Sequence, residues 1–168
     1  MMNVSYWLNI EENLLLVAKR RKEILRLIDL AHRSGFHIGI ISDDYPLLSD
    51  LDVAENLAIS GMYHQNLSLT QVLKKIDPFV QKINAEDLLQ RRIEYLDREE
   101  LLKIYLLRCI ANNNSIILLY EPVFKDIKTI YDLIGLLDKK TRLWIACLEK
   151  NTERYYSFGF KEIMISDK

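Results

Sequence analysis

Three carboxylates follow apolar runs that are short enough to be buried strands. Asp43 and Asp44 come directly after "HIGIIS", and Glu121 comes directly after "SIILLY". Because parallel strands place their carboxyl ends at one edge of a sheet, these side chains are expected in one crevice. Three convergent carboxylates can hold Mg²⁺ for phosphoryl transfer or phosphate-ester chemistry. A magnesium-dependent enzyme is therefore one hypothesis for this chain.

The other side chains that carry out metal or nucleophilic chemistry form no recognisable site. Cys109 and Cys147 lie inside apolar runs without metal-type spacing, so they are interpreted as buried, reduced thiols. The three histidines are scattered, and each is interpreted as a structural or surface residue: His32, His37 and His64. These residues predict no cofactor.

The composition is typical of a compact, helix-rich globular domain. The 168 residues are 49% hydrophobic and 28% charged, with only five glycines and three prolines. A net charge of −1 gives no global attraction to nucleic acid, so nucleic-acid binding is disfavoured. No apolar run approaches the roughly 20 residues that a membrane span requires, and no signal peptide is expected. The expected location is the cytoplasm.

Short apolar runs alternate with helical periodicity along most of the chain. Strands are expected at 12–18, 37–42, 115–120, 142–148 and 161–167, and longer helices at 19–35, 97–113 and 126–140. This alternation predicts an α/β fold with a mainly parallel sheet and flanking helices. The chain, 1–168, is expected to form a single domain.

A helical subdomain is expected within that domain, at 52–95, because three helical segments follow one another there without a strand. The segments include 55–60, 68–83 and 84–96. The second begins with a capping box formed by Ser68 and Gln71, and the long helix after the subdomain begins with Asp97 and Glu100 at the same spacing.

Two long stretches resemble the nucleotide-binding domain of ABC transporters. "IGIISDDYPLLSDLDVAENLAI" (38–59) resembles the Q-loop stretch, with Asp43 at the glutamine position, and "YLDREELLKIYLLRCIANNNSIILLYEPV" (95–123) resembles the signature helix running into the Walker B strand. The residues that keep the family's types are Leu96, Arg108, Ala111, Glu121 and Pro122. The resemblance covers most of 36–123 and implies a truncated P-loop NTPase-like fold with a helical lobe.

The phosphate-binding loop of that family is missing. A Walker A loop needs glycines, because only bare backbone wraps closely around phosphates. Here no glycine occurs before Gly35, and the first strand passes into its helix through "VAKRRKEIL". The basic run Lys19–Lys22 is interpreted as a solvated turn, with a makeshift anion site as the alternative.

Other positions that the resemblance assigns to catalysis are also changed. Asp97, Arg98 and Glu99 replace the signature Ser-Gly-Gly, Tyr120 replaces the aspartate that organises Mg²⁺, and Cys147 or Leu148 stands where the switch histidine is expected. Glu121 matches the general base, but a carboxylate activates water only where phosphates and Mg²⁺ are fixed nearby. The losses together predict a fold kept without ATPase chemistry.

The leading hypothesis is a pseudo-ATPase, a catalytically inactive interaction or regulatory component of an ABC-type transport system. The resemblance implies a membrane permease subunit, an intact ABC ATPase subunit, or both, as partners, and it also allows a homodimer. A complex with a permease would hold the protein at the cytoplasmic face of the inner membrane. The stretch "EPVFKDI" resembles ATPases of phospholipid-trafficking systems, which makes a lipid-related system a further expectation.

The family groove that receives a permease helix lies at the Q-loop and the helical lobe. Tyr45, Pro46, Leu47 and Leu48 are expected to be exposed there and to bind the partner, with ordinary packing between lobe and core as the alternative. The magnesium enzyme built on Asp43, Asp44 and Glu121 stays a second hypothesis. A regulatory module bound to something other than a transporter is a third.

Overall fold

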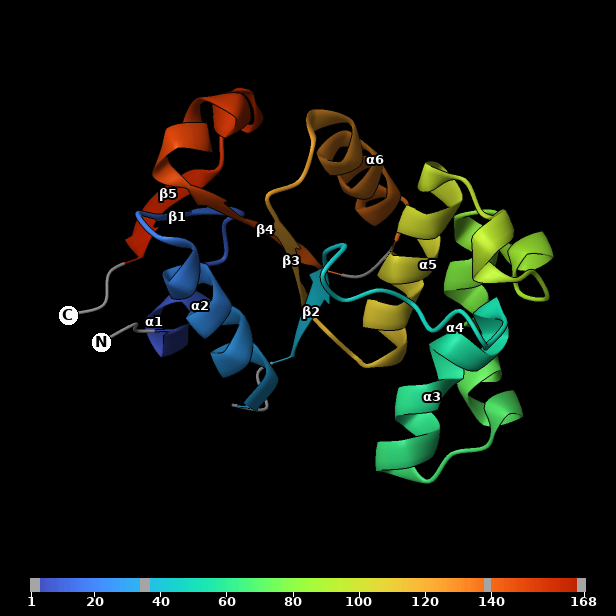
Figure 1. Ribbon diagram of the computed structural model, residues 1–168. Helices are drawn as coiled ribbons and strands as arrows, with labels where there is room; N and C mark the ends of the chain where they lie inside the picture. The colour runs from blue at the N-terminus through green and yellow to red at the C-terminus, as the bar shows by residue number, and fades with distance from the viewer. Residues whose placement is uncertain (1–3, 34–36, 138–139, 166–168) are drawn as a thin grey trace.

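Five parallel strands form the centre of the molecule (Figure 1). The computed structural model describes residues 4–33, 37–137 and 140–165. The sheet has the order β2-β3-β4-β1-β5, and the strands are β1 (Leu14–Ala18), β2 (Ile38–Ile41), β3 (Ile116–Tyr120), β4 (Arg142–Leu148) and β5 (Lys161–Ile165). Every described pairing in it is parallel, so all the strands end at the same edge.

Helices cover both faces of the sheet. α1 (Val4–Leu8) and α2 (Arg21–Arg33) lie on one face, and α5 (Arg98–Ala111) and α6 (Phe124–Gly135) lie on the other (Figure 1). The strands are apolar throughout because both faces are buried: Leu14 and Leu16 join the cluster under α2, whereas Leu15 and Val17 join the cluster under α5 and α6.

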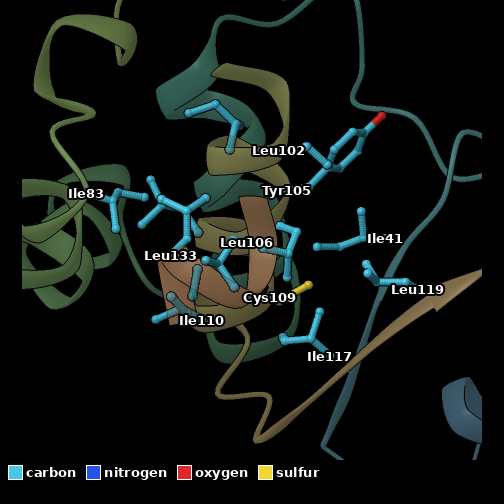
Figure 2. Close-up of a cluster of buried hydrophobic side chains, with 14 of the residues drawn as sticks. Ile41, Ile83, Leu102, Tyr105, Leu106, Cys109, Ile110, Ile117, Leu119 and Leu133 are labelled. Carbon is cyan, nitrogen blue, oxygen red and sulfur yellow. The ribbon is translucent and has the colours of Figure 1, made fainter. Parts of the chain in front are cut away.

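α5 is the helix around which the second half of the core is built. On one side it contacts the sheet, and on the other it contacts α3 (Val53–Gln65) and α4 (Leu69–Lys82). Figure 2 shows the resulting cluster, in which side chains of α5 lie between Ile117 and Leu119 of β3 and Ile83 at the end of α4. One continuous apolar core therefore joins the sheet to the helices of 52–95, and the assignment of 52–95 as a subdomain stays a prediction.

Capping boxes fix where three of the helices begin. In each box, the side-chain oxygen of the capping residue accepts the backbone N–H of the third helical residue, and the side chain of that third residue accepts the backbone N–H of the capping residue. The pairs are Asp52 with Glu55, Ser68 with Gln71, and Asp97 with Glu100. The two boxes that were predicted from the sequence are thus present.

The strands and the longer helices fall where the sequence predicts them, but 84–96 does not form the expected helix. It consists of two short 3₁₀ turns, η1 (Glu86–Leu88) and η2 (Ile93–Tyr95). Asn84 has a φ of 49°, which ends the helical path, and an isolated bridge between Asp52 and Arg92 holds the segment extended. α1 and the 3₁₀ segment η3 (Glu149–Phe158) were not anticipated. The predicted element ends at 34–35, 138–139 and 166–167 lie outside the described residues.

Candidate functional site

The turn between β1 and α2 is filled by the protein's own carboxylate. Glu23 is 3% exposed, and its Oε2 accepts the backbone N–H groups of Lys19 and Arg20 at 3.0 and 3.1 Å. Its Oε1 accepts two further hydrogen bonds from the Arg20 guanidinium, at 3.0 and 2.8 Å. These hydrogen bonds hold the pKa of Glu23 below its usual value, against the opposing effect of burial.

Glu23 is a residue of the candidate site that the sequence interpretation missed. It is the third residue of α2, a position from which a glutamate commonly reaches back to the N–H of the residue before the helix. That spacing was the available signal. The four basic residues of the turn, Lys19–Lys22, have exposed side chains, but Arg20 pairs with Glu23 and Arg21 pairs with Asp44. The turn is therefore more ordered than a freely solvated basic run.

Tyr120, which ends β3, faces this turn. The guanidinium of Arg21 lies over its ring, 5.9 Å from the centroid, and the same guanidinium donates to Asp44 Oδ2 at 3.2 Å. Partial burial raises the pKa of the Tyr120 hydroxyl, which keeps the phenol protonated at neutral pH. A neutral phenol is a poor ligand for Mg²⁺. The contact joins the first turn of α2 to the ends of β2 and β3.

Asp43 belongs to a different cluster, in which Arg98 is central. Arg98 is the first residue of α5, and it donates to Asp43 Oδ1 at 2.8 Å and to Asp126 Oδ2 at 2.5 Å. Asp126 is a buried residue in the first turn of α6. The hydrogen bond to Asp126, with a smaller effect of the one to Asp43, raises the pKa of Arg98 further above its usual value. Arg98 thereby fastens the loop after β2 to the start of two helices.

The carboxylate of Glu121 is hydrogen-bonded to residues at and just after the end of β4. Its Oε1 accepts the backbone N–H of Leu148 at 2.6 Å, and its Oε2 accepts the side-chain amide of Asn151 at 2.8 Å. The backbone of Glu121 has a φ of 45°, a conformation that costs a non-glycine residue about 1 kcal/mol or more and is retained where the surroundings fix it. The carboxylate therefore joins the end of β3 to the end of β4.

The three carboxylates at the strand ends do not share one site. Asp43 and Glu121 both line a hollow of about 70 Å³, but Asp44 does not. Each of the three has a different partner: Arg98, Arg21, and the pair Leu148 and Asn151. Among the residues that the structure describes, no group of three or more His, Cys, Asp or Glu side chains could hold a metal ion. The expected convergence of Asp43, Asp44 and Glu121 on a metal is wrong.

Neither residue at the expected switch-histidine position presents a polar side chain. Cys147 is buried, and burial raises the pKa of its thiol to about 11, so it is not a thiolate at neutral pH. Leu148 contributes its backbone N–H to Glu121. Cys109 is likewise buried, with the pKa of its thiol raised to about 12. Both cysteines are structural.

A groove of about 760 Å³ lies beside the edge strand β2. Its walls come from β2, the loop after β2, α3 and the C-terminal half of α5; the residues are His37, Ile38, Gly39, Ile40, Asp44, Tyr45, Pro46, Leu48, Ser60, His64, Arg108, Cys109, Asn112 and Asn114. Three of the four predicted partner-binding residues, namely Tyr45, Pro46 and Leu48, line this groove.

Leu47 does not line the groove, and its expected exposure is wrong; Tyr45, also expected to be exposed, is half-buried against the core cluster under α2. The side chain of Leu47 is 6% exposed and belongs to the core cluster under α5 and α6, whereas Leu48 is 50% exposed. Adjacent residues in an extended segment point in opposite directions, so a loop that lies across the core buries one leucine and presents the next. Leu47 therefore anchors the loop, and Leu48 is available to a partner.

Two side chains hold that loop in place. The guanidinium of Arg108 donates to the carbonyls of Tyr45 and Pro46 at 3.0 and 3.1 Å. Asn56, buried in α3, accepts the N–H of Leu48 at 2.7 Å and donates to the Leu48 carbonyl at 3.0 Å. The groove wall is consequently preformed. Asn56 lies beside Leu57 and Ala58 in α3, and no sequence pattern had singled it out for this clamp.

The outer face of α3 continues the apolar surface next to the groove. α3 is apolar on most sides, and its exposed residues include Ile59, Met62 and Tyr63, the last being 84% exposed. The ring of Tyr63 contacts that of His64 edge-on, with the centroids 5.0 Å apart. No helix among the described residues is long and apolar enough to cross a membrane.

No protein-family model matches the sequence. Among solved structures, the dimeric bacterial ABC transporter cassette MJ0796 is similar, with a TM-score of 0.61 and 17% identity over 86% of this chain and 78% of that chain. MJ0796 in a post-hydrolysis state bound to ADP and Pi gives 0.61 and 15% identity over 84% and 77%. CbiO1 of Clostridium perfringens, part of the ABC transporter complex cbiONQ, gives 0.61 and 14% identity over 84% and 69%. The chain has the P-loop NTPase-like fold of an ABC-transporter ATPase cassette.

Proposed function

We propose that this chain is a catalytically inactive ABC ATPase-like subunit, which contributes binding surfaces rather than ATP hydrolysis to an ABC-type transport system. One observation carries the proposal. The backbone N–H groups at the β1–α2 turn, where the fold would hold phosphates, are bound by the carboxylate of Glu23. A phosphate there would meet a buried negative charge, which repels it, and would find the donors already used.

The ends of β3 and β4 support the same conclusion. Tyr120 is packed against Arg21, and Glu121 is hydrogen-bonded to Leu148 and Asn151. Each oxygen of Glu121 already accepts a hydrogen bond from the protein, which holds the carboxylate toward the end of β4 and favours a structural role over the activation of water.

The groove beside β2 supports docking as the retained function. Its wall is preformed by Arg108 and Asn56, and it presents Tyr45, Pro46 and Leu48. The similar cassettes are described as dimers or as part of a transporter complex. By likeness to them, the partners proposed for this chain are a permease segment in the groove and a second cassette subunit.

Calorimetric titration with Mg-ATP tests the inactivity. No saturable heat is expected at millimolar nucleotide, with an ATP-hydrolysing cassette titrated in parallel as the positive control. A dissociation constant in the micromolar range would overturn the proposal, because it would require a phosphate site that coexists with Glu23.

Co-expression with a candidate permease and its cassette tests the docking. Leu48→Asp should abolish co-purification, because it places a charge in the apolar part of the groove. Leu136→Asp is the matched control, since Leu136 is 53% exposed, close to the 50% of Leu48, and does not line the groove. Complexes that survive Leu48→Asp, or that are lost equally with both variants, would contradict docking at the groove.

A further inference from the structure

Two ionised side chains line the groove beside β2, Arg108 and Asp44, together with the imidazoles of His37 and His64. Asp44 is the single carboxylate among them, and it is paired with Arg21 at 3.2 Å. The negative charge in the wall is therefore already compensated before any partner binds.

Arg108 has no such compensation. Its guanidinium bonds the carbonyls of Tyr45 and Pro46 and lies over the ring of Tyr105, 5.0 Å from the centroid. All of these groups are neutral, and Arg108 forms no ion pair with a carboxylate in the described part of the chain. Guanidinium groups at interfaces favour carboxylate or phosphate partners.

The two imidazoles add donors from different elements of the wall. His37 precedes β2, and His64 lies in the last turn of α3. In either protonation state an imidazole keeps at least one N–H, so both side chains can donate to a carboxylate. In the part of the chain that the structure describes, neither histidine side chain donates to an acceptor, although the ring of His64 contacts that of Tyr63.

The rest of the lining combines apolar side chains with the polar residues Ser60, Asn112 and Asn114, and the groove is small. Pro46 and Leu48 from the loop and Ile38 and Ile40 from β2 contribute carbon surface. A volume of about 760 Å³ lies within the range of roughly 300–1,000 Å³ that is typical of ligand pockets. It suits a few residues of a partner rather than a broad protein face.

From these features, and resting on the docking function proposed above, we propose that the groove binds a short peptide segment of a partner protein that carries an aspartate or glutamate between apolar side chains. The carboxylate lies toward Arg108, His37 and His64, and the apolar side chains contact Pro46 and Leu48. A segment with a lysine or arginine at that place is repelled by Arg108 and finds no free carboxylate in the wall.

Panning a random 12-residue phage-displayed peptide library against the intact chain tests this proposal. Counter-selection against Leu48→Asp isolates the peptides whose binding depends on the groove. These are expected to be enriched in Asp or Glu flanked by Leu, Ile or Phe, and depleted of Lys and Arg. Groove-dependent peptides without acidic residues would overturn the carboxylate inference while supporting the docking function. The absence of groove-dependent peptides would instead contradict the docking function itself.

One enriched peptide then serves as the probe for charge. Replacing its acidic residue by the amide should weaken binding by about fivefold or more, and added salt should weaken only the acidic form. His64→Glu in the protein should weaken the acidic peptide by a similar factor. Gln65→Glu adds the same charge one residue away, outside the groove lining, and should change affinity little. Equal affinities of the wild-type protein for the acid and amide peptides would overturn the inference. The affinities of the two protein variants are compared once thermal melts show that both unfold at the wild-type temperature.

Discussion

Replacing Glu23 by alanine tests whether the β1–α2 turn depends on its internal carboxylate. The substitution removes the acceptor of two backbone N–H groups and the partner of Arg20. Each N–H that is left buried and unsatisfied costs about 1–3 kcal/mol, and water entering the vacated space reduces that cost. The Arg20 side chain is more than half exposed, so its ion pair contributes at most about 1 kcal/mol. The expected loss in the free energy of unfolding is about 2–4 kcal/mol.

Urea unfolding followed by circular dichroism measures this loss. Glu99→Ala is the control, because Glu99 is an exposed glutamate in the first turn of α5 and contributes through the helix dipole alone, about 0.5 kcal/mol. A Glu23→Ala variant as stable as Glu99→Ala would refute the inference that the carboxylate holds the turn.

The difference in the free energy of unfolding between the wild type and a variant that lacks the Glu23 carboxylate should also depend on pH. The hydrogen bonds of Arg20 keep the pKa of Glu23 below its usual 4.5. A depressed pKa means that the unfolded chain takes up the proton first, so the stabilisation is present above about pH 4.5 and is lost as the pH falls through the folded-state pKa. The gap between wild type and Glu23→Gln should be constant near neutral pH and narrow in acid. A gap that widens in acid would contradict the assignment.

Inorganic phosphate offers a second measurement on the same variant. In Glu23→Ala the N–H groups of Lys19 and Arg20 become available to an anion, so phosphate should raise the melting temperature of the variant more than that of the wild type. Equal shifts would show that the carboxylate does not occupy an anion site.

Four further substitutions test the surroundings of the groove and of α5. Leu47→Ala should lower the free energy of unfolding by about 2–5 kcal/mol because Leu47 is buried, whereas Leu48→Ala should change it by less than about 0.5 kcal/mol. Equal melting temperatures for the two variants would contradict the burial of Leu47. Gly39→Ala should cost about 1–3 kcal/mol, because a Cβ there overlaps the side chain of Cys109, and an unchanged melting temperature would show that α5 and β2 can separate freely. Arg98→Ala leaves the buried aspartate of α6 without its guanidinium and should cost about 1–3 kcal/mol in chemical denaturation, with full stability refuting the bridge.

The sheet and the long helices could be predicted from the sequence because their signals are local. An apolar run of five residues or a capping box is read from neighbouring positions, and β3 and the start of α5 follow from such patterns. The turns of 84–96 escaped prediction because they are held by pairing with Asp52, which lies far away in the sequence.

The site was harder to predict because it depends on which side chains meet across elements. The missing glycines predict that the phosphate loop is absent, but they gave no sign that Glu23 would accept the backbone N–H groups of Lys19 and Arg20. Strand ends predicted that Asp43, Asp44 and Glu121 would be near one another, yet the arginines and the amide that separate them come from other segments. Likewise, no local pattern distinguishes Leu47 from Leu48 in an irregular loop.

The loop that follows β2 is tied to both ends of a single helix. Arg98 holds it at Asp43, and Arg108, ten residues further along α5, holds it at Tyr45 and Pro46. Ten residues of α-helix span about 15 Å, and a helix packed on both sides does not bend easily. A displacement of the groove wall is therefore expected to move α5 as a rigid body. The other end of α5 is hydrogen-bonded to α6 through Arg98 and Asp126. Under the proposed function, in which nucleotide drives no motion, such a helix is expected to transmit the movement of a partner at the groove to α6.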